Sequence, residues 1–250
     1  GYDGCEIKGL STKPGYSERV SSVKSLVIDR TVYYSAAMSR NTEHDTREHL
    51  LATGERLCMH RGFTGMGLSE LLKTAEVPKG SFYHYFRSKE AFGVAMLERH
   101  YACYHQRLAA HFASGEGNYR DRVLNYYQET LTQFCQQGII SGCLTVKLSA
   151  EVCDLSEDMR TAMDKGASGV IALLAQALEK GRNEKTLSFP GEPLTQAQVL
   201  YALWLGANLQ AKISRSAVPL ESALAHVKSS ITTPGVNTLN NSSCRKAARE

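Results

Sequence analysis

The residues with the clearest capacity for chemistry lie in the segment SGCLTVKLSAE, in which Cys143 is followed by Lys147. Ser141 is a suitable N-cap, so Cys143 is predicted to fall in the first turn of a helix, where free backbone N–H groups favour a negative charge. Lys147 is four residues further on and therefore lies on the same helical face. Both effects stabilise a thiolate and make a cysteine nucleophilic. The alternative is that Cys143 is a small buried hydrophobic residue, which is the commoner role of a cysteine.

A second cation of interest is Lys212, near the end of an apolar segment that contains Trp204 and Leu209. A lysine in such a segment is costly unless its ammonium group reaches solvent or finds a partner. In one interpretation, Lys212 extends its head to solvent at the end of its helix. In the other, it faces Cys143 in the domain core, where it stabilises the thiolate and its nitrogen captures an oxidised sulfur atom.

The remaining cysteines differ in sequence context. Cys58 lies on the apolar face of a predicted helix and is expected to pack in a core. Cys103, in the histidine-containing segment HYACYHQR, is a weaker candidate for a reactive thiol. Cys153 is another secondary candidate for a sensing thiol, although the Asp154 carboxylate next to it disfavours its thiolate. Lys147 is a secondary candidate for the cation that accompanies the sensing thiol.

Several classes of site are disfavoured by the residue pattern. The seven cysteines are irregularly spaced and include no C-x-x-C pair, so the sequence supports neither a zinc site nor a secreted disulfide framework. A cysteine enzyme built around Cys143 needs a histidine base, and no histidine occurs between residues 119 and 219. We therefore expect no catalytic activity, no metal ion and no cofactor.

The composition is that of a globular protein, with 250 residues, 42% hydrophobic residues and a net charge of +4. This mildly basic balance permits an acidic partner. No run of about 18 apolar residues occurs, so we expect a cytoplasmic protein without a membrane span. Residues 1–40 and 237–250 lack helical periodicity and are predicted to be unpatterned extensions outside the folded unit.

Nearly all of the intervening sequence has the periodicity of amphipathic helices, and strand alternation is scarce, which predicts an all-α fold. Asp45 and Glu48 have capping-box spacing and are predicted to begin the first helix, which Gly62 ends. Ser88 is the predicted cap of a long helix, and Thr195 with Gln198 forms another capping box. Further helices are predicted at 67–77, 78–86, 89–112, 119–137, 142–152, 156–181, 195–214 and 219–231.

Two short helices separated by a tight break indicate a helix-turn-helix, whose second helix enters the major groove of DNA. The segment VPKGSFYHYFRSKEAF has the residues that such a helix uses for phosphates and base edges, namely Lys79, Ser81, Tyr83, His84, Tyr85, Arg87 and Lys89. The alternative is a surface helix that packs through Phe82 and Phe86 and leaves its polar residues solvated.

The segment GFTGMGLSELLKTAEVPKGSFYHYFRSKEAF resembles the DNA-binding domain of the TetR family of bacterial transcriptional repressors, and the resemblance extends from Asp45 to about Glu98. It implies a helix-turn-helix domain at residues 41–90, followed by a helical regulatory and dimerisation domain at residues 91–236. Many relatives have Ser or Thr where this chain has Gly67, so only a backbone N–H is available to phosphate there. The DNA contacts implied by the resemblance are Lys79, Gly80, Ser81, Tyr83, Tyr85 and Lys89, with His84 beside them.

The segments ISGCLTVKLSAEVCDLSEDMR and VLYALWLGANLQAKISRS resemble more narrowly a group of this family whose cysteines react with electrophiles and reactive chlorine. That resemblance implies that Cys143 is the redox-sensing thiol of a repressor of detoxification genes, and it favours Lys212 as its partner. Oxidation or alkylation of the thiol would relieve operator binding. The alternative is a repressor induced by a reversibly bound small ligand, with Cys143 only lining the pocket.

Apolar stripes near the C-terminal end of the chain suggest an oligomer. One apolar surface serves the core of the monomer, and a second would form a four-helix interface across a two-fold axis. We expect a homodimer, because two reader helices related by such an axis match a pseudo-palindromic operator in double-stranded DNA. The stripes comprise Leu203, Leu205 and Leu209 and, further along the chain, Leu220, Leu224, Val227 and Ile231.

Overall fold

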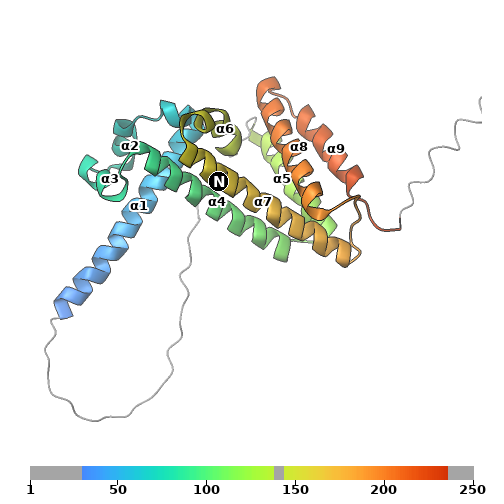
Figure 1. The fold of residues 1–250 in the computed structure, drawn as a ribbon, viewed down its shortest axis with the longest axis horizontal. Helices are drawn as coiled ribbons and strands as arrows, with labels where there is room; N and C mark the ends of the chain where they lie inside the picture. Colours follow the sequence, from blue (N-terminus) through green and yellow to red (C-terminus); the bar gives the residue numbers. More distant parts are fainter. Residues whose placement is uncertain (1–29, 138–143, 236–250) are drawn as a thin grey trace, which may run out of the picture. The chain divides into compact units, whose positions relative to one another are not determined.

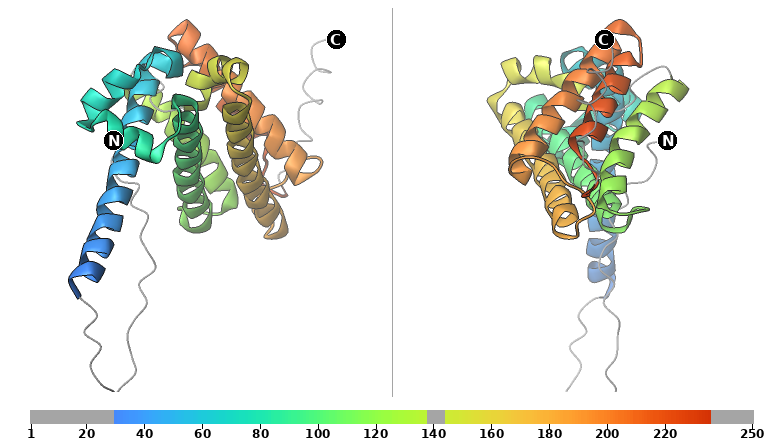
Figure 2. Two further views of the ribbon diagram at one scale, coloured as in Figure 1. Left: turned by 60° about the vertical axis from the view of Figure 1, so that its left-hand side comes forward. Right: turned by 90° about the vertical axis from the view of Figure 1, so that its right-hand side faces the viewer.

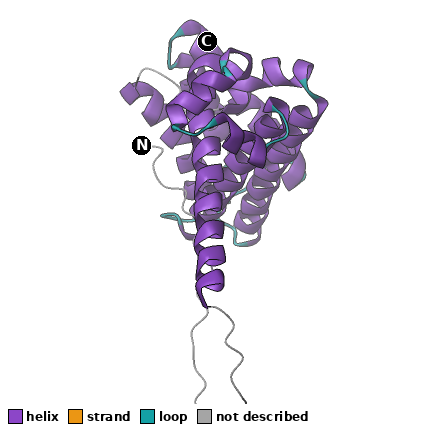
Figure 3. Ribbon diagram, turned by 90° about the vertical axis from the view of Figure 1, so that its left-hand side faces the viewer, coloured by secondary structure: helices purple, strands orange, loops and turns teal. Residues whose placement is uncertain are grey.

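The computed structural model describes residues 30–137 and 144–235. Within these ranges the chain forms nine helices joined by loops, and the only strand-like pairing is an isolated antiparallel bridge between Ser188 and Thr232 (Figure 3). The all-α prediction is confirmed. The helices are α1 (Arg30–Gly65), α2 (Leu68–Ala75), α3 (Lys79–Tyr85), α4 (Lys89–Ser114), α5 (Tyr119–Gln137), α6 (Leu144–Leu155), α7 (Glu157–Asn183), α8 (Pro193–Ser214) and α9 (Val218–Ser230).

The chain divides into two compact units, residues 1–49 and 50–250, and α1 belongs to both. In the first unit α1 is helical from Arg30, so the prediction that the first helix begins at Asp45 is wrong. A capping residue begins a helix only where the residue before it leaves the helical conformation. No glycine or proline between residues 30 and 45 interrupts the helix.

Gly62 breaks α1, as predicted from its residue type. Its backbone has φ 78° and ψ 173°, a conformation that residues with a Cβ atom rarely adopt. A single further turn, up to Gly65, resumes the helix beyond the break. The loop that follows leads to α2, so the break sets the direction in which the chain enters the two short helices.

Buried side chains of the second unit form two clusters. The first, which we call the α1–α4 core, contains residues of α1 to α4, such as Leu50, Phe82 and Phe92, together with one face of α6 and the start of α7. The second, the α5–α9 core, contains residues from the end of α4, from α5, from the rest of α7, and from α8 and α9. The two long helices α4 and α7 contribute to both cores, and they run side by side in two views of the chain (Figures 1 and 2).

Glycines allow α4 and α7 to approach each other closely. A Cβ atom added at Gly166 of α7 would overlap the ring of Tyr101 on α4, and one added at Gly169 would overlap the ring of His105. The Nε2 atom of His105 donates to the carbonyl oxygen of Gly166 over 2.8 Å. The contact between these two helices is therefore fixed by both shape and a hydrogen bond.

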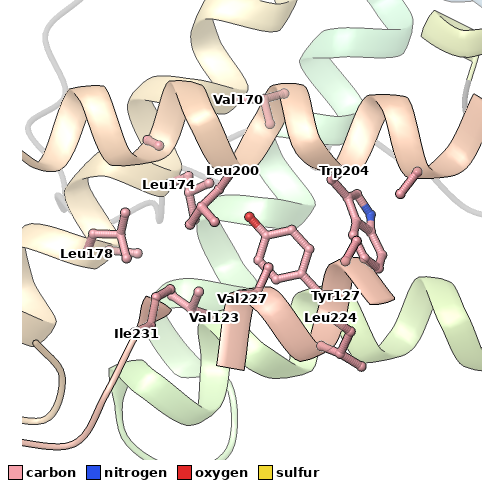
Figure 4. Close-up of a cluster of buried hydrophobic side chains, with 14 of the residues drawn as sticks. Val123, Tyr127, Val170, Leu174, Leu178, Leu200, Trp204, Leu224, Val227 and Ile231 are labelled. Atoms are coloured by element: carbon pink, nitrogen blue, oxygen red, sulfur yellow. The ribbon is translucent and has the colours of Figure 1, made fainter. Parts of the chain in front are cut away.

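The α5–α9 core surrounds Tyr127 of α5, which is fully buried (Figure 4). Its ring meets Trp204 of α8 edge to face, with 4.8 Å between the ring centroids. The predicted apolar stripe near the end of the chain (Leu220, Leu224, Val227 and Ile231) is buried in this core and therefore serves the monomer.

Two helix caps were predicted for α4 and α8, and the structure has the first but not the second. The hydroxyl of Ser88 accepts the Ala91 N–H over 3.0 Å and caps α4 as predicted. The predicted capping box at Thr195 is wrong, because α8 begins at Pro193 with Glu192 as its N-cap. Proline has a φ angle suited to the first helical position and starts the helix before Thr195 is reached.

A partly buried ion pair ties α1 to α4. The carboxylate of Glu55 accepts a hydrogen bond from Nη1 of Arg99 over 3.1 Å and lies 2.7 Å from Nδ1 of His100. Burial raises the pKa of Glu55, but the hydrogen bond and charge of His100 and the charges of Arg99 and Arg107 outweigh it. The pKa of this carboxyl group is therefore lowered from its ordinary value of 4.5.

Replacement of Glu55 by glutamine should reveal this contribution. A carboxyl group whose pKa is depressed on folding stabilises the protein above its unfolded pKa, and this stabilisation is lost as the pH falls through the folded pKa. Glu55→Gln should therefore lower the free energy of unfolding at pH 7 by roughly 1 to 3 kcal/mol. The deficit should shrink below pH 4.5, as measured by urea unfolding across pH. Glu179→Gln, at an exposed site on α7, is the control, and a pH-independent deficit would contradict the assignment.

Candidate nucleic-acid interface

The helix α3 has two faces of different character. Phe82 and Phe86 are buried in the α1–α4 core, where Phe82 lies 5.6 Å from Phe92 between ring centroids. The opposite side of α3 is open to solvent, with Tyr83 51% exposed and His84 exposed as well. The helix therefore packs against the core through Phe82 and Phe86 and also has an exposed side that DNA can reach.

The residues predicted to contact DNA lie on or beside this open side of α3. Lys79 and Gly80, at the start of α3, are exposed, whereas Ser81 and Tyr85 are half-buried. A helix start also presents free backbone N–H groups to an anion such as phosphate. The arrangement places cationic, hydroxyl and aromatic groups together at the surface of one short helix.

Two further cations follow α3. Arg87 is exposed in the loop, and Lys89 is the first residue of α4. The ammonium group of Lys89 lies 4.8 Å from the ring centroid of Phe63, a cation–π geometry that fixes the position of the charge. Lys89 is half-buried, so part of its side chain remains open to solvent next to α3.

Gly67 is the N-cap of α2 and has no side-chain cap. It is exposed, and an added Cβ atom would meet no neighbour within 4 Å. The start of α2 can therefore offer backbone N–H groups to a phosphate, as its residue type implies.

Comparison with known proteins identifies this arrangement. Residues 50–96 match the family model for bacterial regulatory proteins of the tetR family, and residues 119–227 match the model for a tetracyclin repressor-like C-terminal domain. The chain is 82% identical over 199 residues to the HTH-type transcriptional repressor NemR of Escherichia coli, a match that covers 80% of this chain and all of the relative. The chain belongs to the TetR family.

Two further comparisons support the assignment. The crystal structure of the reduced form of E. coli NemR superposes with a TM-score of 0.75 at 81% identity and covers 77% of this chain and 100% of that one. The transcriptional regulator AcuR of Cereibacter sphaeroides is 30% identical over 175 residues, which cover 70% of this chain and 80% of the relative. The chain is thus a NemR-like DNA-binding transcriptional repressor, and its TetR-family relatives are regulators rather than enzymes.

The described residues also bear on whether the chain has a membrane-spanning helix or a metal site. None of them combines the length and the apolar composition that crossing a membrane requires. Within the same part of the chain, no group of three histidine, cysteine or acidic residues is placed to hold a metal ion.

The predicted redox-sensing segment is only partly described. Ser141 and Cys143 lie outside the described residues, and α6 begins directly after them at Leu144. The hydroxyl groups of Thr145 on α6 and Tyr101 on α4 are 2.6 Å apart, which fixes the first turn of α6 against α4. Lys147, half-buried on the next turn, donates to the carbonyl oxygen of His60 on α1 over 3.4 Å.

Lys212 is exposed in the last turn of α8. This exposure is what is expected if its head reaches solvent, whereas its predicted contact with Cys143 stays a prediction, because Cys143 lies outside the described residues. The physical reason is position: the helix ends two residues later, where a long side chain can leave the apolar surface, and a cation there also favours the helix dipole.

The other cysteines of the described residues fall into distinct environments. Cys58 is fully buried, as predicted, with its Sγ 3.8 Å from Sδ of Met66. Burial raises the pKa of Cys58 to about 12, so this thiol stays protonated. Cys103 is buried on α4 and disulfide-bonded. Cys153 on α6 and Cys135 on α5 are free and exposed.

Two groups that the sequence did not indicate link α6 and its C-terminal end to the DNA-binding elements. Glu151 of α6 accepts hydrogen bonds from backbone N–H groups of α1. Ser156, which caps α7 by accepting the Met159 N–H over 3.1 Å, also donates its hydroxyl to Glu90 in the first turn of α4. No local signal could have revealed either link, because the partners are 66 or more residues apart in the sequence.

The surface of α3 can be tested by substitution. Tyr83→Ala and Lys89→Ala should weaken operator binding in gel-shift assays while the chain stays folded, because Tyr83 is exposed and Lys89 lies at the edge of the surface. Loss of one phosphate contact should also reduce the salt slope of Lys89→Ala by about one unit. Lys180→Ala, an exposed lysine at the far end of α7, is the matched control. Wild-type affinity in both variants would rule out this surface.

Proposed function

We propose that the chain is a homodimeric repressor whose operator binding is relieved when Cys143 is oxidised or alkylated. Its operator is a pseudo-palindromic double-stranded DNA, and its inducers are electrophiles or oxidants such as reactive chlorine. The regulated genes serve detoxification of those compounds. As a DNA-binding regulator the protein acts in the cytoplasm.

The observation that carries the proposal is the burial of α6, which begins at the residue after Cys143. Leu144, Leu148 and Val152 are fully buried in the α1–α4 core, the same core that holds Phe82 of the DNA-facing helix. Close-packed cores do not absorb added volume without rearrangement. A modification next to α6 is therefore transmitted to the elements that carry the DNA-binding surface.

The neighbourhood of α6 supports thiol chemistry in two further respects. Lys147 is held half-buried one turn into the helix, where its charge is less screened than that of an exposed lysine. Cys103, a disulfide-bonded cysteine, lies two residues beyond Tyr101, which contacts the first turn of α6. The free, exposed Cys153 remains a secondary sensor candidate, whereas Cys103 has a reactive thiol only after its disulfide is reduced.

A specific observation favours one alternative, induction by a reversibly bound ligand. The hydroxyl of Tyr127 and Oδ1 of Asn208 are buried in the described part of the chain without a hydrogen-bond partner there. Buried polar groups ordinarily have partners. A small molecule that entered beside either atom and offered it a hydrogen-bond partner would satisfy it.

Variants of the thiol separate the two functions. Iodoacetamide should abolish operator binding of the wild type, and added reductant should not restore it, whereas Cys143→Ser should stay bound to DNA. Cys135→Ser is the matched control, because a free, exposed thiol is replaced in the same way while Cys143 is retained. Release of Cys143→Ser by the same treatment would refute the thiol switch and leave the ligand mechanism.

The same assay measures the cations. Lys147→Ala should slow alkylation of Cys143 roughly fivefold, the effect of about 1 kcal/mol from a partly screened charge. Lys212→Ala should slow it less, because Lys212 is exposed and its charge is screened by solvent and salt. A larger effect of Lys212→Ala would establish Lys212 as the principal partner of the thiol.

The dimer is proposed from an exposed stripe on α8. Val199, Leu209 and Ile213 are 46% to 66% exposed, and Ala202 and Gly206 lie between them. The five positions recur every three or four residues and so share one face of the helix. An apolar face with small residues at its centre is suited to close packing against a second helix. On α9, Val218 is also exposed, at 60%.

Gly206 provides a test that spares the monomer. An added Cβ atom at Gly206 meets no atom within 4 Å, so Gly206→Leu should fold normally. The larger side chain should nevertheless prevent close approach of two α8 helices, so the variant should be monomeric in sedimentation and weak in operator binding. Ala172→Leu, at another exposed site, is the matched control. A dimer of wild-type stability in Gly206→Leu would exclude this face as the interface.

A further inference from the structure

The break of α1 at Gly62 creates two helix ends within the folded unit. Residues before the break have backbone carbonyl groups without helical partners, and residues after it have free backbone N–H groups. A helix end is stabilised when its free N–H groups meet a negative charge and its free carbonyl groups meet a positive charge. An anion on one side of the break and a cation on the other therefore stabilise it.

The helix α6 supplies the anion through Glu151. Its Oε2 accepts the Phe63 N–H over 3.1 Å, and its Oε1 accepts the Thr64 N–H. Burial raises the pKa of Glu151, but the hydrogen bonds from Thr64 and Phe63 and the charge of Lys147 outweigh it, so the pKa is lowered. The carboxylate is thus ionised at neutral pH and caps the single turn that follows the break.

The same helix supplies the cation through Lys147. Its ammonium group donates to the His60 carbonyl oxygen over 3.4 Å, on the other side of Gly62. Lys147 and Glu151 are four residues apart and lie on one face of α6. Two successive turns of α6 therefore hold both sides of the break. We call this pair of contacts the α6 clasp.

The clasp is tight, and it leads directly to the DNA-binding surface. A Cβ atom added at Gly62 would come within 2.6 Å of Oε2 of Glu151, so the carboxylate fits against the bare backbone of glycine. Phe63, whose N–H the carboxylate holds, carries the ring that lies beneath the ammonium group of Lys89. One short series of contacts thus joins α6 to a proposed phosphate contact.

We propose that Glu151 is a positioning residue: by capping the turn after Gly62 it sets the orientation of the DNA-binding helices relative to α6, and the state of α6 reaches the operator through this contact. The part of the proposal that concerns signalling rests on the proposed thiol switch. The part that concerns orientation does not, because it refers to the unmodified protein.

The first experiment measures orientation without any thiol reagent. Operators selected in vitro from random DNA by the wild type are altered by one base pair, inserted or deleted between the half-sites. The wild type should discriminate against the altered spacing, whereas Glu151→Ala should lose roughly tenfold of that discrimination, in line with the coupling energies common between sites. Non-specific binding at low salt should be no weaker than that of the wild type, because it depends on charge rather than on the orientation of the two surfaces, and the variant loses a negative charge.

Matched variants separate positioning from folding. Glu151→Gln keeps the shape and one acceptor oxygen and should retain an intermediate discrimination, while Glu151→Asp, which is shorter, should behave like alanine. Asp154→Asn, an exposed acidic residue on the same helix, should behave as wild type. If Glu151→Ala proves too unstable for DNA binding, the comparison of glutamine with aspartate decides the question. Wild-type discrimination in the aspartate and alanine variants, or in the aspartate variant alone if alanine is unstable, would overturn the proposal.

The second experiment adds the signal. The ratio of operator dissociation constants after and before iodoacetamide treatment should fall roughly tenfold in Glu151→Asp relative to the wild type if the clasp carries the coupling. A wild type that does not respond to the reagent refutes the thiol switch, while the spacing experiment still decides on Glu151. A responding wild type with an unchanged ratio in Glu151→Asp limits Glu151 to orientation and overturns its role in signalling.

Discussion

Backbone hydrogen-bonding groups at a helix end must find partners, and in this chain that requirement centres on Gly62. The break turns one helix into two ends that face each other across a single residue. Their partners come from α6, a helix more than 80 residues away in the sequence. Because α6 also buries three side chains in the α1–α4 core, polar capping and apolar packing hold the same two elements together. The DNA-binding helices have no core of their own that is independent of α6.

The features predicted correctly from sequence are those with local causes. The stop at Gly62 follows from the conformational freedom of glycine, and the cap at Ser88 follows from a hydroxyl close to free N–H groups. The buried side of α3 follows from Phe82 and Phe86, which are four residues apart and therefore lie on one face of the helix. Local reasoning failed at Asp45 and Thr195, where a plausible cap was overridden by a helix that had already begun.

In the candidate site, too, the features with local causes were predictable from sequence and those that depend on distant residues were not. Residues of α3 could be identified from a contiguous motif, and the packing of Cys58 from an apolar face. The role of Lys212 could not be settled from the sequence, because a lysine near the predicted helix end at residue 214 is compatible both with a head that reaches solvent and with one that faces the core. The role of Glu151 could not be read from the sequence, because the backbone N–H groups that its carboxylate caps belong to α1 and are 87 or more residues away.

The close contact of α4 with α7 has a mechanical consequence. Where rings of one helix rest on the bare backbone of the other, the two cannot slide past each other, and they behave as one beam rather than two rods. The beam is long: α4 has 26 residues, or roughly 39 Å at the rise of an α-helix. A tilt of about 5° at one end of such a beam moves the other end by roughly 3 Å, about the rise of one base pair along DNA. Angular changes too small to disturb any core are thus large on the scale at which a double helix is read.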